Sequence, residues 1–259
     1  MGDSLALLRL QVEWGADETI DLGPIDRLRP VEAIRAPLPR PVPVMEPPRG
    51  TPGERALGLV GQAATLDELR AALAGFDGCA LRDTATNLVF AEGDPASPTL
   101  IIGEPPGREE DRGGHVFAGP EGQLLDQMLA SIGLSRTELM LTPLLPWRPP
   151  GGRPPSPGEI AICLPFLHRL VALLKPQRIV LFGGTAARAV LPQLQARRRG
   201  PRVWVEGNLP GLPAALPCLA LPGLAEMLKN PPLRREAWAG LRLLRRAIDQ
   251  NLNANVTPH

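Results

Sequence analysis

The chain is poor in aromatic residues and in cysteine, and it carries almost no net charge. Tyrosine is absent from its 259 residues, and aromatic residues make up only 3% of them. The three cysteines are widely spaced and odd in number, which excludes the disulfide framework of a small secreted domain and favours a cytoplasmic location. A formal net charge of +1 gives no overall attraction toward a polyanion, so a nucleic-acid site would have to be a local patch.

The N-terminus lacks the features of a signal peptide or a membrane anchor. It has an acid at Asp3, no basic segment before its short apolar runs and no long hydrophobic stretch, so we predict no membrane contact. Charge is nevertheless uneven along the chain. Residues 1–35 contain seven acidic and four basic residues, whereas residues 229–259 contain six basic and two acidic. The basic end is the better candidate for contacting phosphates, although a solvated helix face explains it equally well.

Proline is abundant, with 32 residues, and its distribution suggests how the chain is divided. Residues 4–14 have the pattern of a short amphipathic helix, and the proline-rich stretch that begins at Arg35 cannot form a regular helix or a central strand. We predict four parts, which are a helical extension (1–34), a linker (35–53), a folded domain (54–250) and a tail (251–259).

Within the domain, short apolar runs alternate with helical patterns. Helices are expected over residues 66–76, where Thr65 and Glu68 form a capping box, and over 121–132, 157–174, 185–195 and 232–250. Buried strands are expected over 99–104, 138–146, 178–184 and 218–223. This alternation predicts an α/β fold, a three-layer α/β/α sandwich around a central, mainly parallel four-stranded sheet. A ligand would bind where the strands end, at residues 103–107, 142–148, 183–185 and 221–224.

The segment "GEPPGREEDRGGHVFAGPEGQLLDQML" (103–129) follows one of these strands and precedes a helix. Gly103 and Gly107 allow backbone N–H groups to approach a ligand closely, and Glu104 is expected to point into the crevice. The segment is neither a Walker loop nor a G-x-G-x-x-G fingerprint. A purely structural turn is an equal alternative.

Four segments together resemble the family 4 uracil-DNA glycosylases of bacteria and archaea, in both order and spacing. They are "GEPPGREEDRGGHVFAGPEGQLLDQML", "RPPGGRPPSPGEIAICLPFL", "PQRIVLFGGTAAR" and "NPPLRREAWAGL". The resemblance covers about residues 76–250. It implies a parallel sheet flanked by helices and a role in base-excision DNA repair, in which a flipped uracil or related damaged base is removed by hydrolysis of its N-glycosidic bond.

The resemblance assigns roles to particular residues. The family motif G-E-x-P-G is matched by Gly103, Glu104, Pro106 and Gly107, and its acid, implicated in positioning water or stabilising the sugar cation, is Glu104. The family's stacking aromatic corresponds to Phe117, for which an ordinary core position is the alternative. Glu110 and Asp111 match the family's E-D pair, and we interpret them as helix or loop caps.

Two departures from the family pattern concern the groups that should contact the base. Pro143 stands where the family has an asparagine, and Leu221 stands where it has the histidine of H-P-S. Neither side chain can donate a hydrogen bond. His115 could supply the missing donor, but a solvated loop histidine is the simpler interpretation. The resemblance therefore implies either a glycosylase with impaired activity or a non-catalytic module that binds DNA or a protein.

The family also holds a four-iron cluster with four cysteines, at positions that read Phe76, Cys79, Trp147 and Cys163 in this chain. Two thiolates do not supply such a site, so we predict no cluster, no metal and no other cofactor. Phe76 and Trp147 are expected to form an apolar plug instead. Cys218 reads as a core residue.

DNA is the predicted partner, either single-stranded or containing uracil, and the acidic N-terminal helix could dock a protein. Arginine suits phosphate contacts because its donors form a planar fork. The candidates are Arg148, Arg153, Arg188, Arg234 and Arg235, with solubility of these surfaces as an equal alternative. A further basic segment, residues 195–202, is expected to be a loop.

Overall fold

The computed structural model describes residues 13–14, 50–192 and 203–256. The chain divides into two units, Met1–Pro47 and Pro48–His259, and nearly all of the described residues belong to the second. The predicted N-terminal helix and most of the predicted linker lie outside the described residues, as does the basic segment 195–202. The paragraphs below concern the second unit.

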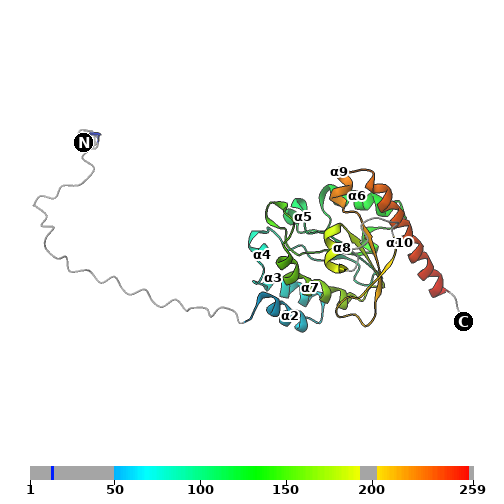
Figure 1. Ribbon diagram of the computed structural model, residues 1–259, viewed down its shortest axis with the longest axis horizontal. Coiled ribbons are helices and arrows are strands. Elements are labelled where there is room, and N and C mark those ends of the chain that lie inside the picture. The colour runs from blue at the N-terminus through cyan, green and yellow to red at the C-terminus, as the bar shows by residue number, and fades with distance from the viewer. Residues whose placement is uncertain (1–12, 15–49, 193–202, 257–259) are drawn as a thin grey trace, which may run out of the picture. The chain divides into compact units, whose positions relative to one another are not determined.

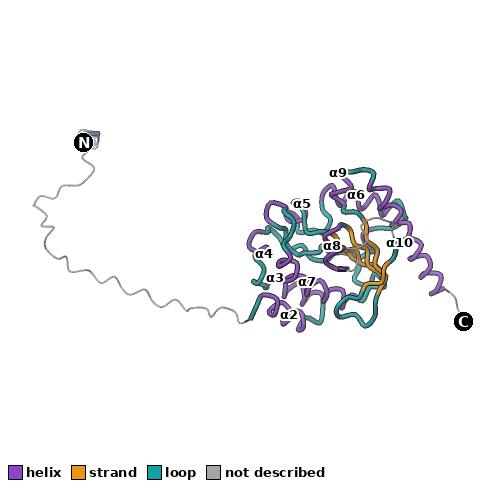
Figure 2. Tube along the Cα trace, in the orientation of Figure 1, coloured by secondary structure: helices purple, strands orange, loops and turns teal. Residues whose placement is uncertain are grey.

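A six-stranded sheet forms the centre of this unit (Figure 2). Its four middle strands are parallel and are those that the apolar runs predict. In spatial order they are β3 (Met140–Pro143), β2 (Thr99–Gly103), β4 (Arg178–Phe182) and β6 (Leu216–Leu221). An antiparallel strand lies at each edge, β1 (Glu92–Gly93) beside β3 and β5 (Val205–Gly207) beside β6. The mainly parallel α/β sheet is confirmed, but the predicted number of four strands is wrong, because strands of two or three residues are too short to show alternation.

Both faces of the sheet are buried. On β2, Leu100 and Ile102 belong to one apolar cluster, whereas Ile101 between them belongs to another. The other parallel strands alternate in the same way, as the two-residue period of a strand requires. A strand that is buried on both faces reads as a continuous apolar run, which is why these four strands were visible in the sequence.

Helices cover each face, which confirms the three-layer arrangement. The cluster that contains Leu100 is completed by α2 (Pro52–Gln62), α3 (Leu66–Gly75), α7 (Pro157–Leu174) and α8 (Gly184–Val190). The cluster that contains Ile101 is completed by α6 (Gly119–Ala130), α9 (Leu224–Lys229) and α10 (Leu233–Val256). Figure 1 shows α6, α9 and α10 grouped together, apart from α2, α3 and α7.

The helices predicted within the folded domain are all present, with shifted ends in three cases. The capping boxes at Thr65 and Ser156 start α3 and α7 at the residues expected. The helix α6 begins two residues before the expected start, and α8 ends at Val190 rather than at residue 195. The helix α10 continues to Val256, so the residues predicted as a tail begin as helix.

Among the described residues, four α-helices were not predicted. Three of them are short, namely α4 (Leu81–Thr84), α5 (Arg108–Gly113) and α9, and so show little periodicity. The fourth, α2, begins at Pro52, inside the last residues of the predicted linker. There Thr51 and Glu54 form a capping box, and proline occupies a first-turn position where its missing N–H costs nothing.

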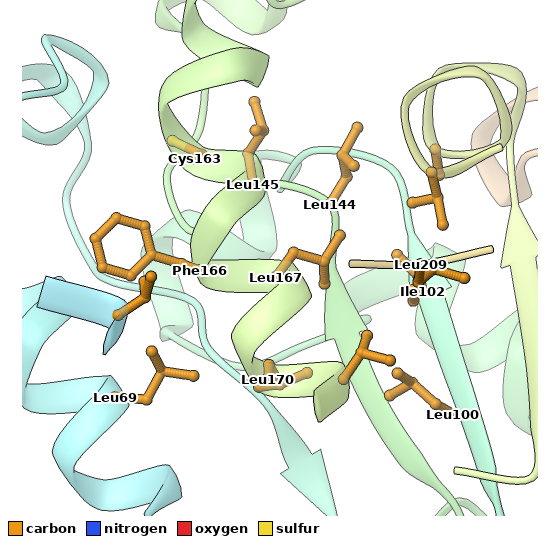
Figure 3. Packing of buried hydrophobic residues seen from close by; sticks show 14 of the residues in the cluster. Leu69, Leu100, Ile102, Leu144, Leu145, Cys163, Phe166, Leu167, Leu170 and Leu209 are labelled. Carbon is orange, nitrogen blue, oxygen red and sulfur yellow. The ribbon is translucent and has the colours of Figure 1, made fainter. Parts of the chain in front are cut away.

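The helix α7 is long and apolar enough to cross a membrane by length and composition alone. It contacts α2 and α3, and its buried face belongs to the sheet-covering cluster. Figure 3 shows Phe166, Leu167 and Leu170 of α7 between Leu69 of α3 and Leu100 of β2. These contacts are those of a core helix in a folded domain.

Candidate functional site

The carboxyl ends of the parallel strands meet at one edge of the sheet, as predicted. Glu104 follows β2, which lies between β3 and β4 in the sheet. Gly183 follows β4, and the Gly183 N–H donates to the carbonyl of Leu221 at the end of β6. Ligands of open α/β sheets bind at this edge, so the candidate site is built around Glu104.

Glycines make room for the Glu104 side chain. A Cβ at Gly183 would lie 2.2 Å from Glu104 Cγ, and a Cβ at Gly223 would lie 3.6 Å from Oε2. Gly183 also has φ +102°, which side chains of L residues rarely allow. The half-buried carboxylate accepts a 3.1 Å hydrogen bond at Oε1 from the backbone N–H of Thr185, in the first turn of α8. Its position is therefore set by neighbouring strands.

Phe117 lies over the end of β2 in an unusual backbone conformation. A Cβ at Gly103 would lie 2.6 Å from two carbons of the Phe117 ring, so only glycine fits beneath the ring. Phe117 has φ +51°, a left-handed conformation that costs a non-glycine residue roughly 1–3 kcal/mol. Its side chain is 5% exposed and belongs to the cluster that contains Ile101. The predicted stacking role stays a prediction, since only a small part of the ring is open to a ligand.

Glu110 fixes the segment that runs from Gly103 to Phe117, here called the site loop. Its Oε2 accepts from the backbone N–H of Gly107 at 2.6 Å, and its Oε1 accepts from the N–H of Phe117 at 2.6 Å. Burial raises the pKa of the Glu110 carboxyl to about 7, against the lowering effect of these two N–H donors. The cap that we predicted for Glu110 is confirmed by its bond to Gly107. The second bond, to Phe117, ties the C-terminal end of the site loop to the same carboxyl group.

The neighbouring Asp111 is also a cap, as predicted. It accepts from the backbone N–H of Thr86 at 2.8 Å and from the Thr86 hydroxyl at 3.2 Å. It therefore joins the site loop to the segment before β1.

Arg136 and Gly122 lie against backbone carbonyl groups of the same loop. Neither residue was predicted from the sequence. Arg136 donates from Nη1 to the carbonyl of Val116 (3.1 Å) and from Nη2 to that of Phe117 (3.2 Å), while its Nε bonds Asp126 at 2.9 Å. A Cβ at Gly122 would lie 1.7 Å from the Phe117 carbonyl oxygen. The sequence offers little indication of this role for Arg136, because an isolated arginine before β3 belongs to no motif.

Leu221 and Pro143 present no polar atoms from their side chains. Leu221 is 3% exposed and packs against α10, where a Cβ at Gly240 would lie 2.2 Å from Leu221 Cδ2. Pro143 is buried and lines a small cavity whose other walls include Cys163 and Phe166. The two positions lack a donor, as the sequence indicates.

His115 does not supply the missing donor. Its side chain is 74% exposed, and Nδ1 lies 2.8 Å from Oε1 of Glu92. The solvated loop histidine is therefore the better interpretation.

The five arginines proposed for DNA contact differ in their surroundings. Arg153 forms two hydrogen bonds with Glu159, of 2.6 and 2.9 Å, and this guanidinium lowers the pKa of the Glu159 carboxyl to about 2. Arg153 is thus the least available to a phosphate. Arg148 is half-buried, and its Nε has no hydrogen-bond partner among the described residues. Arg188, Arg234 and Arg235 are exposed.

The exposed face of α10 adds two residues that the prediction did not include. Trp238 is 47% exposed, and the Arg242 guanidinium lies 5.2 Å from the centre of its ring. Together with Arg235 on the same helix they form a basic surface with an aromatic side chain, a combination that suits a nucleic-acid strand. The sequence could have shown this surface, because Arg235, Trp238 and Arg242 are spaced three and four residues apart and therefore lie on one side of a helix.

The residues at the expected cluster positions do not fit an iron–sulfur cluster. Cys79 and Cys163 lie with their sulfur atoms 3.7 Å apart, and the other two positions are the buried side chains of Phe76 and Trp147. The hydrogen bond between the thiols lowers the pKa of Cys79 to about 7 and raises that of Cys163. Within the described residues no group of three or more His, Cys, Asp or Glu side chains could hold a metal ion. Both aromatic residues belong to the same buried apolar cluster as the two cysteines, and Phe76 contacts Phe166 with 5.2 Å between ring centres.

Comparisons with known proteins cover the residues of this site. The family model described as uracil DNA glycosylase superfamily matches residues 90–245, which include the site loop, Pro143 and Leu221. A type-4 uracil-DNA glycosylase from Pyrobaculum aerophilum is 34% identical over 66% of this chain and 88% of its own length. One from Archaeoglobus fulgidus is 38% identical over 49% of this chain and 63% of its own, and one from Thermotoga maritima is 37% identical over 42% and 56%. The last two matches span less than two thirds of the relatives' lengths.

The first prediction concerns the stability of the site loop. Glu110→Gln keeps one acceptor oxygen but turns an N–H group toward a backbone N–H, so one buried donor loses its partner. We expect the free energy of unfolding to fall by about 1–3 kcal/mol, measured by urea denaturation. Glu109→Gln changes an exposed residue on the same helix and is the matched control, with an expected change within about 0.5 kcal/mol. Equal stability of the two variants would contradict the role given to Glu110.

The second prediction concerns iron. Because the cluster positions hold only two thiols, with two buried aromatic side chains at the other two, protein purified without air should contain no stoichiometric iron and no visible cluster absorption. Metal analysis and an absorption spectrum on the same sample measure this. Iron at four atoms per chain, together with a visible band, would show that the interpretation of these positions is wrong.

Proposed function

We propose that this chain, which belongs to the uracil DNA glycosylase superfamily, hydrolyses the N-glycosidic bond of uracil or a related deaminated base in DNA, at a reduced rate. The relatives that match it are named type-4 uracil-DNA glycosylases, and we carry that substrate to this chain. One observation carries the proposal. The Glu104 side chain lies over Gly183 and the ring of Phe117 lies over Gly103, two glycines at the ends of neighbouring strands on the edge of the sheet where ligands bind.

The chemistry assigns a task to each of these groups. As the bond between C1′ and the base nitrogen breaks, positive charge grows on the sugar and negative charge on the base. The Glu104 carboxylate stabilises the cation and orients a water molecule, whose oxygen adds to C1′. The water proton passes through Glu104 to solvent, and the base leaves with a proton. The ring of Phe117 supports one face of the flipped base.

The reduced rate follows from the two apolar positions. Loss of one preorganised donor costs roughly 10²- to 10³-fold in rate, and Pro143 and Leu221 lack the donors of two family residues. The proposal therefore expects turnover that is slow but still dependent on Glu104.

DNA contact is proposed for the exposed arginines near this edge. Arg188 lies on α8, and Arg234 and Arg235 lie at the start of α10. Arg148 is a weaker candidate because it is half-buried. Arg153 is the weakest because its guanidinium forms an ion pair with Glu159. Trp238 and Arg242 extend this surface along α10. A preference for single-stranded DNA and a cytoplasmic location belong to the same proposal.

A second candidate function is a non-catalytic module that binds DNA or a protein. The packing of Leu221 against Gly240 favours it, because a side chain committed to the core cannot support a departing base. In this alternative the acidic N-terminal segment is the docking arm for a protein partner.

The third prediction tests catalysis directly. The protein is incubated with single-stranded and duplex oligonucleotides that carry one uracil or one hypoxanthine, abasic sites are cleaved with alkali, and gel retardation is measured in parallel. We expect slow product formation that Glu104→Ala abolishes while retardation persists. The control is Glu109→Ala, at an exposed residue of the site loop, which should leave the rate unchanged.

Two outcomes would contradict the proposal. Retardation without product, at every base tested, would support the non-catalytic module. Product that persists undiminished in Glu104→Ala would show that the chemistry takes place without this carboxylate.

A further inference from the structure

A second carboxyl group lies beside Glu104. Glu121 is in the first turn of α6, four residues after Phe117, and is half-buried. A Cβ at Gly107 would lie 3.9 Å from Glu121 Oε1, so the carboxyl reaches back over the site loop. This carboxyl has no task in the reaction described so far.

Two charged groups on different elements act on Glu121. Glu104 at the end of β2 repels its negative form, and Lys229 at the end of α9 attracts it. Glu110 on α5 is also close enough for the two carboxyls to influence one another. In the part of the chain that the structure describes, no side chain or backbone N–H donates a hydrogen bond to the Glu121 carboxyl. The group is therefore held in the site without a partner that would keep it ionised.

Burial is the main reason that the pKa of Glu121 is raised, and the charge of Glu104 raises it further. Lys229 acts in the opposite direction but is an exposed side chain. Glu121 thus keeps its proton at higher pH than an ordinary glutamate. A protonated carboxyl offers an O–H donor next to a C=O acceptor, which an ionised one does not.

The site needs such a donor on the side of the departing base. Pro143 and Leu221 have none, and His115 is turned to Glu92. The geometry points to Glu121 as the hydrogen-bond donor to the departing base, in place of the amide and imidazole that positions 143 and 221 lack. This inference rests on the proposed function and names the second reacting group of the same site.

The step balances with two carboxyl groups in opposite roles. The C1′–N bond breaks, and the proton of Glu121 moves to the departing base. The oxygen of water bonds to C1′, and one water proton moves to the Glu104 carboxylate and then to solvent. Glu121 regains a proton from solvent. Glycoside hydrolases divide acid and base work between two carboxyl groups in the same way.

The same donor and acceptor pair predicts the class of base. Uracil, hypoxanthine and xanthine each present a ring N–H beside a carbonyl oxygen, which matches the C=O and O–H of a protonated carboxyl. Cytosine and adenine present an amino group and an unprotonated ring nitrogen at that edge. The pair should therefore select uracil and hypoxanthine over cytosine and adenine, whereas guanine and thymine, which present the same N–H and carbonyl, are not rejected by it.

The fourth prediction is the pH dependence of base release. In the wild type the rate should fall at higher pH as Glu121 loses its proton, and burial together with the charge of Glu104 places that fall above the range of an ordinary glutamate. Glu121→Gln keeps an N–H donor that does not titrate but cannot transfer a proton, so the rate should be lower than in the wild type and its fall at higher pH should disappear. Glu121→Leu removes the donor, and the rate should drop roughly 10²- to 10³-fold. Glu226→Gln, at an exposed residue on α9, is the control and should behave like the wild type.

The outcomes separate this inference from the proposed function. If base release depends on Glu104 but both Glu121 variants keep the rate and pH profile of the wild type, the inference is wrong and the function stands. If the wild type releases no base at any pH, the function and the inference both fail. Thermal unfolding of each variant, with an unchanged midpoint, shows that a lost rate is not a lost fold.

Discussion

The carboxyl group of Glu110 is the contact on which the candidate site depends. Its two oxygens accept hydrogen bonds from the N–H groups of Gly107 and Phe117, ten residues apart along the chain, and so fix the length and course of the site loop. Phe117 adopts its left-handed conformation against an energetic cost, and only a segment held at both ends keeps such a conformation. Arg136 completes this restraint on the carbonyl side.

The sheet supplies the other half of the site. Three neighbouring parallel strands end in or just before a glycine, namely Gly103, Gly183 and Gly223. The absence of a side chain leaves room for the Phe117 ring at Gly103 and for the Glu104 side chain at Gly183 and Gly223. The positions that should face the base have changed, whereas these glycines and the Glu104 carboxylate are present. The match to the glycosylase superfamily covers all of these positions, and the proposed function assigns the binding of a flipped base to the part that is present.

Much of this fold can be predicted from sequence patterns that have a local physical cause. The four parallel strands are buried on both faces and appear as apolar runs, and the capping boxes at Thr65 and Ser156 mark where helices begin. The edge strands β1 and β5 could not be read, since two or three residues have no period. The caps at Glu110 and Asp111 were predicted, but the bond from Glu110 to Phe117 was not, because it depends on how the loop closes. The positive φ of Phe117 and the packing of Leu221 against Gly240 arise only from tertiary contacts.

The most direct test of the account is a crystal structure with an oligonucleotide that carries a 2′-fluoro-2′-deoxyuridine, whose glycosidic bond resists cleavage because the fluorine destabilises the sugar cation. The account predicts a flipped base with one face against the Phe117 ring, its sugar C1′ facing Glu104, and the site loop still closed by Glu110. A base that remains stacked in its strand, or that binds away from Phe117 and Glu104, would contradict it.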